Sequence, residues 1–349
     1  MSRLYLAFLG SVILFFSTVS WAVPANETAS ATQATQLSPE KIELAMKRFT
    51  RAPHPMASAE QRKLTQEMKA ALLKDGWDAQ VQKFKAITPN TQSERVGGKD
   101  KKAPPSKELE GENLIAISKG TDRCLVLIAG HYDTKVFNQF RFVGANDGGS
   151  STALMQDLAR VISEQRKLDT ASKTGMNVNS GAALASTGRW LDCSVGLVFF
   201  DGEEAILPEW SDGERYLDIQ DNIYGSRAFA KNLDPQFEGV LYKGMPIKAA
   251  FVIDMVGHQN QHLFVTNGSN PQLVQKFLAQ KTSTKIAAVN IAIEDDHLPL
   301  AQLNVPFVHV IDWTNLNEWH KESDTLEIIS MKNIADFGDM LFRFLKSKR

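Results

Sequence analysis

The sequence predicts an α/β fold, a three-layer α/β/α sandwich around a mixed, largely parallel central sheet. Short apolar runs, rich in β-branched or aromatic residues and followed by polar, charged or glycine residues, predict buried strands at 125–128, 195–200, 249–253 and 305–311. Helical patterns lie between these runs. Strands that alternate with helices form parallel sheets that are covered on both faces, so this order favours a sandwich.

The first part of the chain predicts two helices and a strand. A helix is expected from Ser38-Pro39, because serine can cap a helix and proline suits its first turn. A second helix is expected over 58–73, followed by a strand at 79–84. Residues 88–110 are rich in lysine and glycine and predict a surface loop. Residues 165–189 are rich in Ser, Ala, Gly and Thr and predict an exposed insertion.

The N-terminal residues predict export. Arg3 is followed by an apolar run and then by small residues around Ala22, which is typical of a signal peptide at 1–22 that is cleaved after Ala22. The alternative is a membrane anchor, but the run is shorter than the roughly 20 residues that a spanning helix needs. Residues 23–38 then predict a flexible leader and 39–349 a single catalytic domain. We therefore expect a secreted or periplasmic protein without a stable membrane anchor.

Charge and cysteine content narrow the possibilities further. The formal net charge of −1 and the lack of a basic stripe make nucleic acid an unexpected partner. Cys124 and Cys193 each stand at the start of a predicted core strand. In an oxidising compartment such a pair indicates a disulfide, and two buried free thiols are the alternative.

Acidic and histidine residues gather where the predicted strands end. Open α/β sheets bind ligands beyond the carboxyl ends of their strands. Four residues fall at or just past such ends, namely His131, Glu203, Glu204 and Asp254. Two further segments contribute Asp147 and His320. The sequence therefore predicts a site at this edge of the sheet.

The residue types at this edge point to zinc. A catalytic zinc ion is usually held by three nitrogen or oxygen ligands and keeps one position open for water or substrate. Asp147, Glu204 and His320 can supply such a set from three distant segments. Successive side chains of an extended chain point in opposite directions, so Glu203 and Glu204 should not both bind the ion. One of them can then face the substrate as an acid or base.

Five segments resemble a known family: HYDTK (131–135), VGAND (143–147), FFDGEEA (199–205), DDHLP (295–299) and WH (319–320). From about Lys41 to the C-terminus the chain resembles the zinc aminopeptidase-type metallopeptidases, whose fold is called aminopeptidase/phosphorylase-hydrolase-like. More narrowly it resembles their glutaminyl-peptide cyclotransferase branch. The resemblance implies an enzyme that converts the N-terminal glutamine of peptides or proteins to pyroglutamate and releases ammonia.

The resemblance also implies roles for particular residues. It makes Asp147, Glu204 and His320 the ligands of one zinc ion and Glu203 the catalytic proton shuttle. The rest of the implied site consists of a hydrogen-bond network beside Glu203, made by Asp254, Asp295 and His309, and of two substrate-binding tryptophans, Trp210 and Trp319.

Some features leave alternatives open. His131 and Asp254 could hold a second metal ion, and Ser323-Asp324-Thr325 looks more like the peptidases, which bind two zinc ions and hydrolyse N-terminal residues. Asn315 stands where animal-type cyclases have an aromatic residue, so Leu316 or Trp313 must complete the pocket wall, or the pocket stays more open. A zinc aminopeptidase is therefore the alternative enzyme, and a non-catalytic binding protein on the same fold is the alternative from another class.

Overall fold

The computed structural model describes residues 35–92, 105–174, 186–233 and 245–349. The predicted signal peptide and most of the predicted leader lie outside these residues. Leu37, at the end of the predicted leader, is buried, and its backbone N–H donates to the Asp339 carboxylate. In the described part of the chain, no helix has the length and apolar character needed to cross a membrane.

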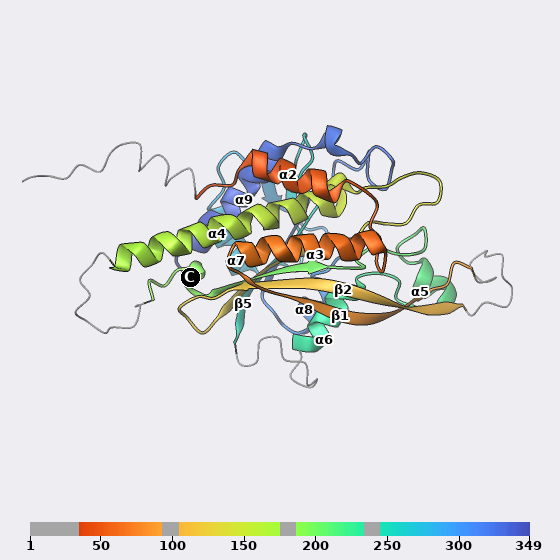
Figure 1. The fold of residues 1–349 in the computed structure, drawn as a ribbon, viewed down its shortest axis with the longest axis horizontal. Coiled ribbons are helices and arrows are strands. Elements are labelled where there is room, and N and C mark those ends of the chain that lie inside the picture. The colour runs from red at the N-terminus through yellow and green to blue at the C-terminus, as the bar shows by residue number, and fades with distance from the viewer. Residues whose placement is uncertain (1–34, 93–104, 175–185, 234–244) are drawn as a thin grey trace, which may run out of the picture. The chain divides into compact units, whose positions relative to one another are not determined.

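One sheet of eight strands forms the middle layer of the described residues (Figure 1). Its spatial order is β1-β2-β4-β3-β5-β8-β6-β7. The strands are β1 (Asp78–Pro89), β2 (Ser106–Ser118), β3 (Leu125–His131), β4 (Ser194–Phe200), β5 (Ile247–Asp254), β6 (Leu263–Val265), β7 (Ile286–Ala288) and β8 (Phe307–Ile311). The central strands β4, β3, β5 and β8 are parallel, whereas β1, β2 and β6 introduce antiparallel pairs.

Helices cover both faces of the sheet (Figure 1). The larger core lies between one face and α2 (Pro39–Phe49), α3 (Ala59–Lys74), α4 (Ser151–Thr174), α7 (Pro271–Leu278) and α9 (Met331–Lys346). On the other face, α6 (Tyr224–Leu233) and α8 (Leu298–Gln302) pack through residues such as Phe229 and Leu300. Neighbouring strand residues alternate between the cores, with Val126 in the first and Leu127 in the second. The predicted α/β/α sandwich is thereby confirmed.

The strand register places the predicted site residues at one edge. His131 at the end of β3 is opposite Phe200 at the end of β4, and Asp254 at the end of β5 is opposite Ile311 at the end of β8. Four parallel strands therefore finish together. The loops that follow them meet at the same edge, as expected for an open α/β sheet.

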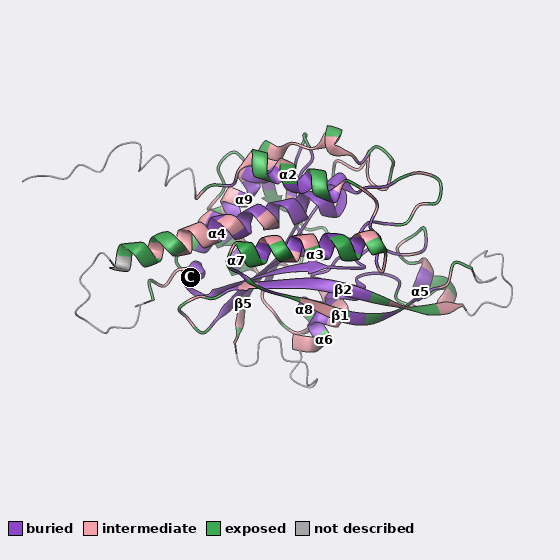
Figure 2. Ribbon diagram, viewed as in Figure 1, coloured by how far each residue is buried: buried purple, intermediate pink, exposed green. Residues whose placement is uncertain are grey.

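The two predicted polar loops are shorter than expected. Residues 88 and 89 extend β1, and residues 106–110 begin β2, so only the middle of the predicted surface loop is left between these strands. The hairpin end is polar because it is exposed (Figure 2), and its paired strands are linked by the ion pairs Lys83–Glu110 and Lys85–Glu108, each at 2.8 Å. In the predicted insertion, residues 165–174 instead continue α4. Residues 93–104 and 175–185 lie outside the described residues.

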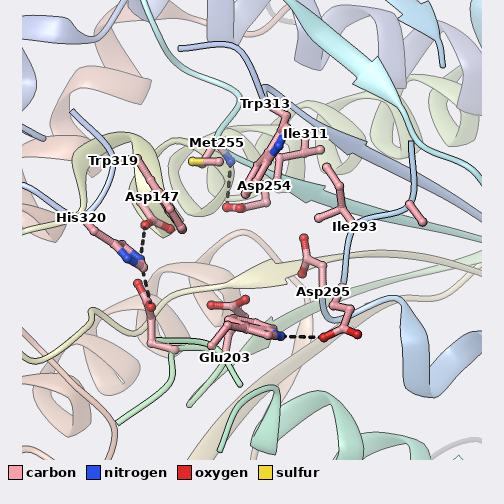
Figure 3. A pocket seen from close by; sticks show the side chains of 14 residues that line it. Asp147, Glu203, Asp254, Met255, Ile293, Asp295, Ile311, Trp313, Trp319 and His320 are labelled. Atoms are coloured by element: carbon pink, nitrogen blue, oxygen red, sulfur yellow. Dashed lines mark hydrogen bonds and ion pairs between the residues drawn. The ribbon is translucent and has the colours of Figure 1, made fainter. Parts of the chain in front are cut away.

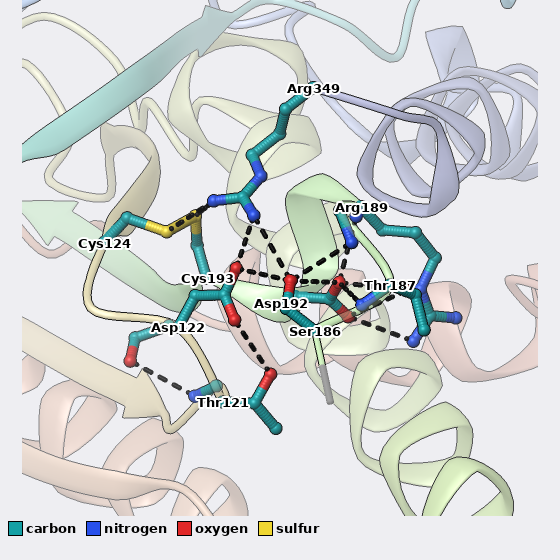
Figure 4. The surroundings of a disulfide bond; sticks show 12 residues. Thr121, Asp122, Cys124, Ser186, Thr187, Arg189, Asp192, Cys193 and Arg349 are labelled. Atoms are coloured by element: carbon teal, nitrogen blue, oxygen red, sulfur yellow. Dashed lines mark hydrogen bonds and ion pairs between the residues drawn. A yellow bond between two sulfur atoms is a disulfide. The ribbon is translucent and has the colours of Figure 1, made fainter. Parts of the chain in front are cut away.

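A disulfide joins Cys124 and Cys193 at the opposite edge of the sheet (Figure 4). The two cysteines directly precede the neighbouring parallel strands β3 and β4, so the bond links the starts of two core strands. The guanidinium group of Arg349 lies 3.1 Å from the Cys124 sulfur and donates to the Asp122 carboxylate. The C-terminal residue is thus attached to the same corner of the fold.

Candidate active site

The predicted site residues surround a cavity of about 290 Å³ at the carboxyl edge of the parallel strands. Figure 3 shows His320 and Asp147 on one side of this cavity and Asp295 on the other, with Glu203 between them. Asp147 lies in the turn Ala145–Ser150, directly before α4, and His320 lies in the loop between β8 and α9. Segments far apart in the chain therefore meet in one place.

Asp147, Glu204 and His320 form a cluster that suits a metal ion. Each offers one ligand atom, and these atoms lie within 4.8 Å of one another. The Nε2 atom of His320 is 3.4 Å from Asp147 Oδ2 and 3.3 Å from Glu204 Oε2. Asp147 Oδ2 and Glu204 Oε1 are buried and have no hydrogen-bond partner among the described residues. Buried carboxylate oxygens without a hydrogen-bond donor fit a cation, because a buried polar atom that is left unsatisfied is costly.

A second cluster shares Asp147 with the first. The ligand atoms of His131, Asp147 and Asp254 also lie within 4.8 Å of one another. The Nε2 atom of His131 is 3.2 Å from Asp147 Oδ1 and 3.2 Å from Asp254 Oδ1. The residues of these clusters would suit one metal ion or two, with Asp147 common to both clusters.

The charges in these clusters stabilise one another. Burial disfavours the protonated form of His320, but Glu204 and Asp147 outweigh this effect and raise the pKa of the imidazole to about 10. Burial would raise the pKa of Asp147, yet His131 and His320 lower it below its ordinary value. The imidazole and carboxylate groups of the clusters therefore lie close enough to stabilise each other's charged forms.

Glu203 lines the cavity but belongs to neither cluster. Its Oε2 atom is 4.0 Å from Nδ1 of His131. Burial raises the pKa of Glu203 well above its ordinary value, the nearby His131 opposes this, and the negative charge of Glu204 adds to it. The neighbouring glutamates therefore occupy different surroundings, and a buried carboxyl group with a raised pKa is a candidate for proton transfer.

The predicted network beside Glu203 is only partly assembled. His309 Nε2 lies 2.8 Å from Asp295 Oδ2, and His309 Nδ1 lies 2.8 Å from the Thr266 hydroxyl. Burial alone would raise the pKa of Asp295, but His309 reverses this effect and lowers it. Asp254 is instead within hydrogen-bond distance of His131 and accepts from the backbone N–H of Met255.

Three tryptophans line the cavity, namely Trp210, Trp313 and Trp319. Trp319 stacks on His320 with ring centroids 4.0 Å apart and meets Trp313 edge-on at 5.5 Å. Of the alternatives for completing the wall, Trp313 is among the lining residues. Asn315 turns to other partners, because its side-chain amide donates to Asp312 and to the backbone carbonyl of Asn260.

Tight backbone turns position several site residues. Gly148 follows Asp147 with a φ of 83°, and a Cβ atom there would lie 2.9 Å from the His131 ring. Gly202 precedes Glu203 with a φ of 70°. His320 itself has a φ of 56°, which is uncommon for a residue with a side chain, although histidine adopts it more readily than most residues.

The sequence analysis assigned no role to three residues that support the site in the structure. Asp133 accepts the backbone N–H groups of Glu203 and Glu204 at 3.1 and 3.4 Å. The buried Lys135 ammonium donates to the carbonyl oxygens of Ala205 and Leu207 and lies 3.8 Å from Glu204 Oε2. Asp324 is the third, and burial beside the negative Asp147 raises its pKa to about 7. Asp133 and Lys135 fall within the HYDTK segment, which was the available signal.

The family of the chain follows from a comparison with known families. Residues 113–345, which are well over half of the chain, match the model of peptidase family M28. The chain belongs to peptidase family M28. The matched region includes both metal-type clusters, as well as Glu203 and the tryptophans of the cavity.

Several proteins from other species are similar to this chain in sequence. The chain is 28% identical over 303 residues to a glutaminyl-peptide cyclotransferase of Dictyostelium discoideum, which covers 78% of this chain and 74% of that protein. It is 29% identical over 252 residues to a glutaminyl-peptide cyclotransferase of Drosophila melanogaster, which covers 65% of this chain and 62% of that protein. The second match spans less than two thirds of the Drosophila protein.

Solved structures share the fold of this chain. The glutaminyl cyclase of an Acidobacteriales bacterium has a TM-score of 0.65 and 24% identity, covering 95% of this chain and 98% of that one. The glutaminyl cyclase of Macrostomum lignano has a TM-score of 0.64 and 20% identity, covering 94% of both chains. A leucine aminopeptidase precursor from Bacteroides thetaiotaomicron has a TM-score of 0.68 and 16% identity, covering 90% and 98%. At these identities the similarity describes the fold alone.

Proposed function

We propose that this M28 protein is a zinc-dependent glutaminyl-peptide cyclotransferase that acts on peptides or proteins with an N-terminal glutamine. In this reaction the α-amino nitrogen attacks the γ-amide carbon of the same residue. A carbon–nitrogen bond forms to close the pyroglutamate ring, the bond to the amide nitrogen breaks, and ammonia leaves. The names of the curated relatives support this activity.

The observation that carries the proposal is the position of Glu203. It is a buried carboxyl group with a raised pKa that lines the cavity between the metal-type cluster and Asp295, and it is not part of either cluster. Cyclisation needs one group that takes a proton from the attacking amine and returns it to the leaving nitrogen. Because the nucleophile belongs to the substrate, the cavity has only to hold the glutamine curled, which supplies the proximity effect.

Asp147, Glu204 and His320 would hold the zinc ion in this proposal. A bound zinc ion would serve as a Lewis acid, which polarises the γ-carbonyl group and stabilises negative charge on its oxygen. Glu203 holds and moves the proton, and Asp295 with its His309 partner presents a second negative group to the substrate amine. The apolar faces of Trp210 and Trp319 exclude water from the neutral glutamine side chain.

A zinc aminopeptidase is the second candidate. The observation in its favour is the cluster of His131, Asp147 and Asp254, which offers a place for a second ion beside the first. Here Glu203 would activate a water molecule instead of the substrate amine.

Mass spectrometry of a Gln-initiated peptide and of a Leu-initiated peptide, each incubated with zinc-loaded protein, separates the candidates. We expect the Gln peptide to lose the mass of one ammonia and the Leu peptide to stay intact. Release of free leucine faster than glutamine is cyclised would replace the cyclotransferase with the aminopeptidase. A protein that binds zinc and changes neither peptide would support a non-catalytic binding role.

We further propose that the chain is exported and cleaved after Ala22, which would make it a secreted or periplasmic protein. We also propose that residues 39–349 form one catalytic domain. The disulfide between Cys124 and Cys193 supports export, because disulfides persist in oxidising compartments. N-terminal sequencing of the protein recovered from the periplasm or medium tests the cleavage site. Protein that begins at Met1 and stays with the membrane would contradict it.

A further inference from the structure

Glu294 lies at the rim of the cavity. Six carboxylate residues line the cavity, and five of them are buried: Asp147, Glu203, Glu204, Asp254 and Asp295. Glu294 is exposed to solvent. Among the lining residues, the one basic side chain is His320, which the proposed function assigns to the metal. The part of a substrate that extends from the cavity into solvent would therefore contact the Glu294 carboxylate.

The Glu294 carboxylate is fixed against a wall of the cavity. Its Oε2 atom accepts the indole N–H of Trp210 at 2.8 Å. A carboxylate has about four acceptor sites. In the described part of the chain, the Trp210 indole occupies one acceptor site of the Glu294 carboxylate. No lysine or arginine of the described residues forms an ion pair with Glu294. The exposed carboxylate thus has no basic partner among the described residues and keeps acceptor positions for a ligand.

The segment that carries Trp210 is rich in carboxylates, but none of them is among the residues that line the cavity. Residues 209–221 contain five carboxylates and one arginine. That arginine, Arg215, lies with its guanidinium 5.8 Å from the centre of the Tyr216 ring in α5 (Asp212–Leu217). The segment begins at the cavity through Trp210, whose backbone carbonyl accepts the Asn222 amide. Asp221 is buried and accepts the backbone N–H groups of Ile206 and Leu207, whereas Glu294 is the exposed carboxylate among the residues that line the cavity.

We infer that Glu294 makes the enzyme prefer substrates with lysine or arginine directly after the N-terminal glutamine. The inference rests on the proposed function. If the glutamine side chain occupies the cavity, the next residue lies one Cα step of about 3.8 Å away and must leave past the rim. A long cationic side chain can there reach the Glu294 carboxylate, whereas an acidic one is repelled. Opposite charges favour encounter and pairing at such a surface.

The expected effect is modest because the pair is exposed. Exposed ion pairs are weak and are screened by salt, so we expect a preference of about 2- to 5-fold in kcat/KM over a neutral residue at low ionic strength. The same reasoning predicts that the preference declines as salt is added. An acidic residue after glutamine should be the poorest of the three.

Three peptides that differ only in the residue after glutamine (Lys, Ala or Glu) test the inference with zinc-loaded protein. Glu294→Gln is the informative variant, because its amide oxygen can still accept the Trp210 N–H while the charge is removed. Glu43→Gln, on the exposed side of α2, is the matched control for loss of one surface charge. We expect the order Lys, Ala, Glu in the wild type and in Glu43→Gln, and nearly equal values in Glu294→Gln.

Binding supplies a second readout. Calorimetry of the same peptides with Glu203→Gln, which should bind without turning over, is expected to give the same order of affinities. The order should vanish in the double variant with Glu294→Gln. Equal kcat/KM for all three peptides in the wild type, or a preference that persists in Glu294→Gln, would overturn the inference. Cyclisation of none of the peptides would instead overturn the proposed function on which it rests.

Discussion

The carboxylate of Asp324 accepts a hydrogen bond from the backbone N–H of Asp147 at 3.1 Å. Its other oxygen accepts the N–H of Asn146 at 2.7 Å, and its side chain is 1% exposed. Asp324 follows His320 in the same loop. The Asp324 side chain therefore joins two segments that are far apart in the chain. One segment contains Asp147 and the other contains His320, both members of the proposed zinc cluster.

From this relationship we expect Asp324→Ala to weaken zinc binding by about 10- to 100-fold, the usual effect of losing a group that orients a ligand. Asp324→Asn should have a smaller effect, because its single oxygen can accept one of the two N–H groups. Titration with a fluorescent zinc chelator measures the affinity, and circular dichroism checks that the variants fold. Asp336→Ala, on α9, is the control. Unchanged affinity in a folded Asp324→Ala protein would exclude the positioning role.

The second prediction concerns the number of ions. Glu204→Ala or His320→Ala should abolish zinc binding and activity, since too few ligands remain. His131→Ala should retain one ion if the protein uses only the first cluster, and should lose one of two ions if both clusters are filled. Elemental analysis after dialysis against zinc gives the stoichiometry. Full occupancy in Glu204→Ala or His320→Ala would refute the assignment of these ligands.

The sequence predicted the central strands well because their composition depends on burial. Four apolar runs became β3, β4, β5 and β8 within a few residues, and Ser38 caps α2 through a hydrogen bond from the Lys41 N–H, as expected. The sequence missed β2, because its exposed first half is polar, and it missed the three-residue strands β6 and β7. Their pairing depends on partners distant in the chain, which local periodicity does not reveal.

The site could be assembled from the sequence because parallel strands end at a common edge. Residues that act through the backbone could not be found in this way. Asp133 and Asp324 accept N–H groups from segments 70 and 177 residues away or more, so only the folded chain shows their partners. The position of Glu294 against Trp210 likewise depends on two loops that meet at the rim.

The third prediction separates proton transfer from metal binding. Glu203→Gln keeps the shape of the side chain and removes its titrating group, so turnover should fall by roughly 100-fold or more while zinc stays bound. Steady-state kinetics and elemental analysis of one preparation test both statements. Loss of the metal from Glu203→Gln would mean that the roles of the two glutamates are reversed.

The fourth prediction concerns stability. The disulfide spans 69 residues of sequence, so replacing both Cys124 and Cys193 by alanine should lower the free energy of unfolding by about 2–4 kcal/mol. Activity per folded molecule should not change, because the bond lies a whole strand, roughly 20 Å, from the site. Denaturant unfolding with and without reductant measures the effect. A double variant with the same free energy of unfolding as the wild type would show that the disulfide does not contribute to stability.

The last prediction addresses the aromatic wall. Trp319 lines the cavity and stacks on His320, so its ring is placed to contact the substrate, to support the proposed metal ligand His320, or to do both. If it packs against the glutamine side chain, Trp319→Ala should lose about 1–3 kcal/mol of binding in the transition state, which is the scale for one large apolar group. The fall in kcat/KM should be similar for several Gln-initiated peptides, with zinc retained. Tyr216→Ala, which removes an aromatic ring that is 60% exposed, is the control and should leave kcat/KM unchanged. If zinc affinity falls in parallel with activity, Trp319 supports His320 and does not form the substrate wall.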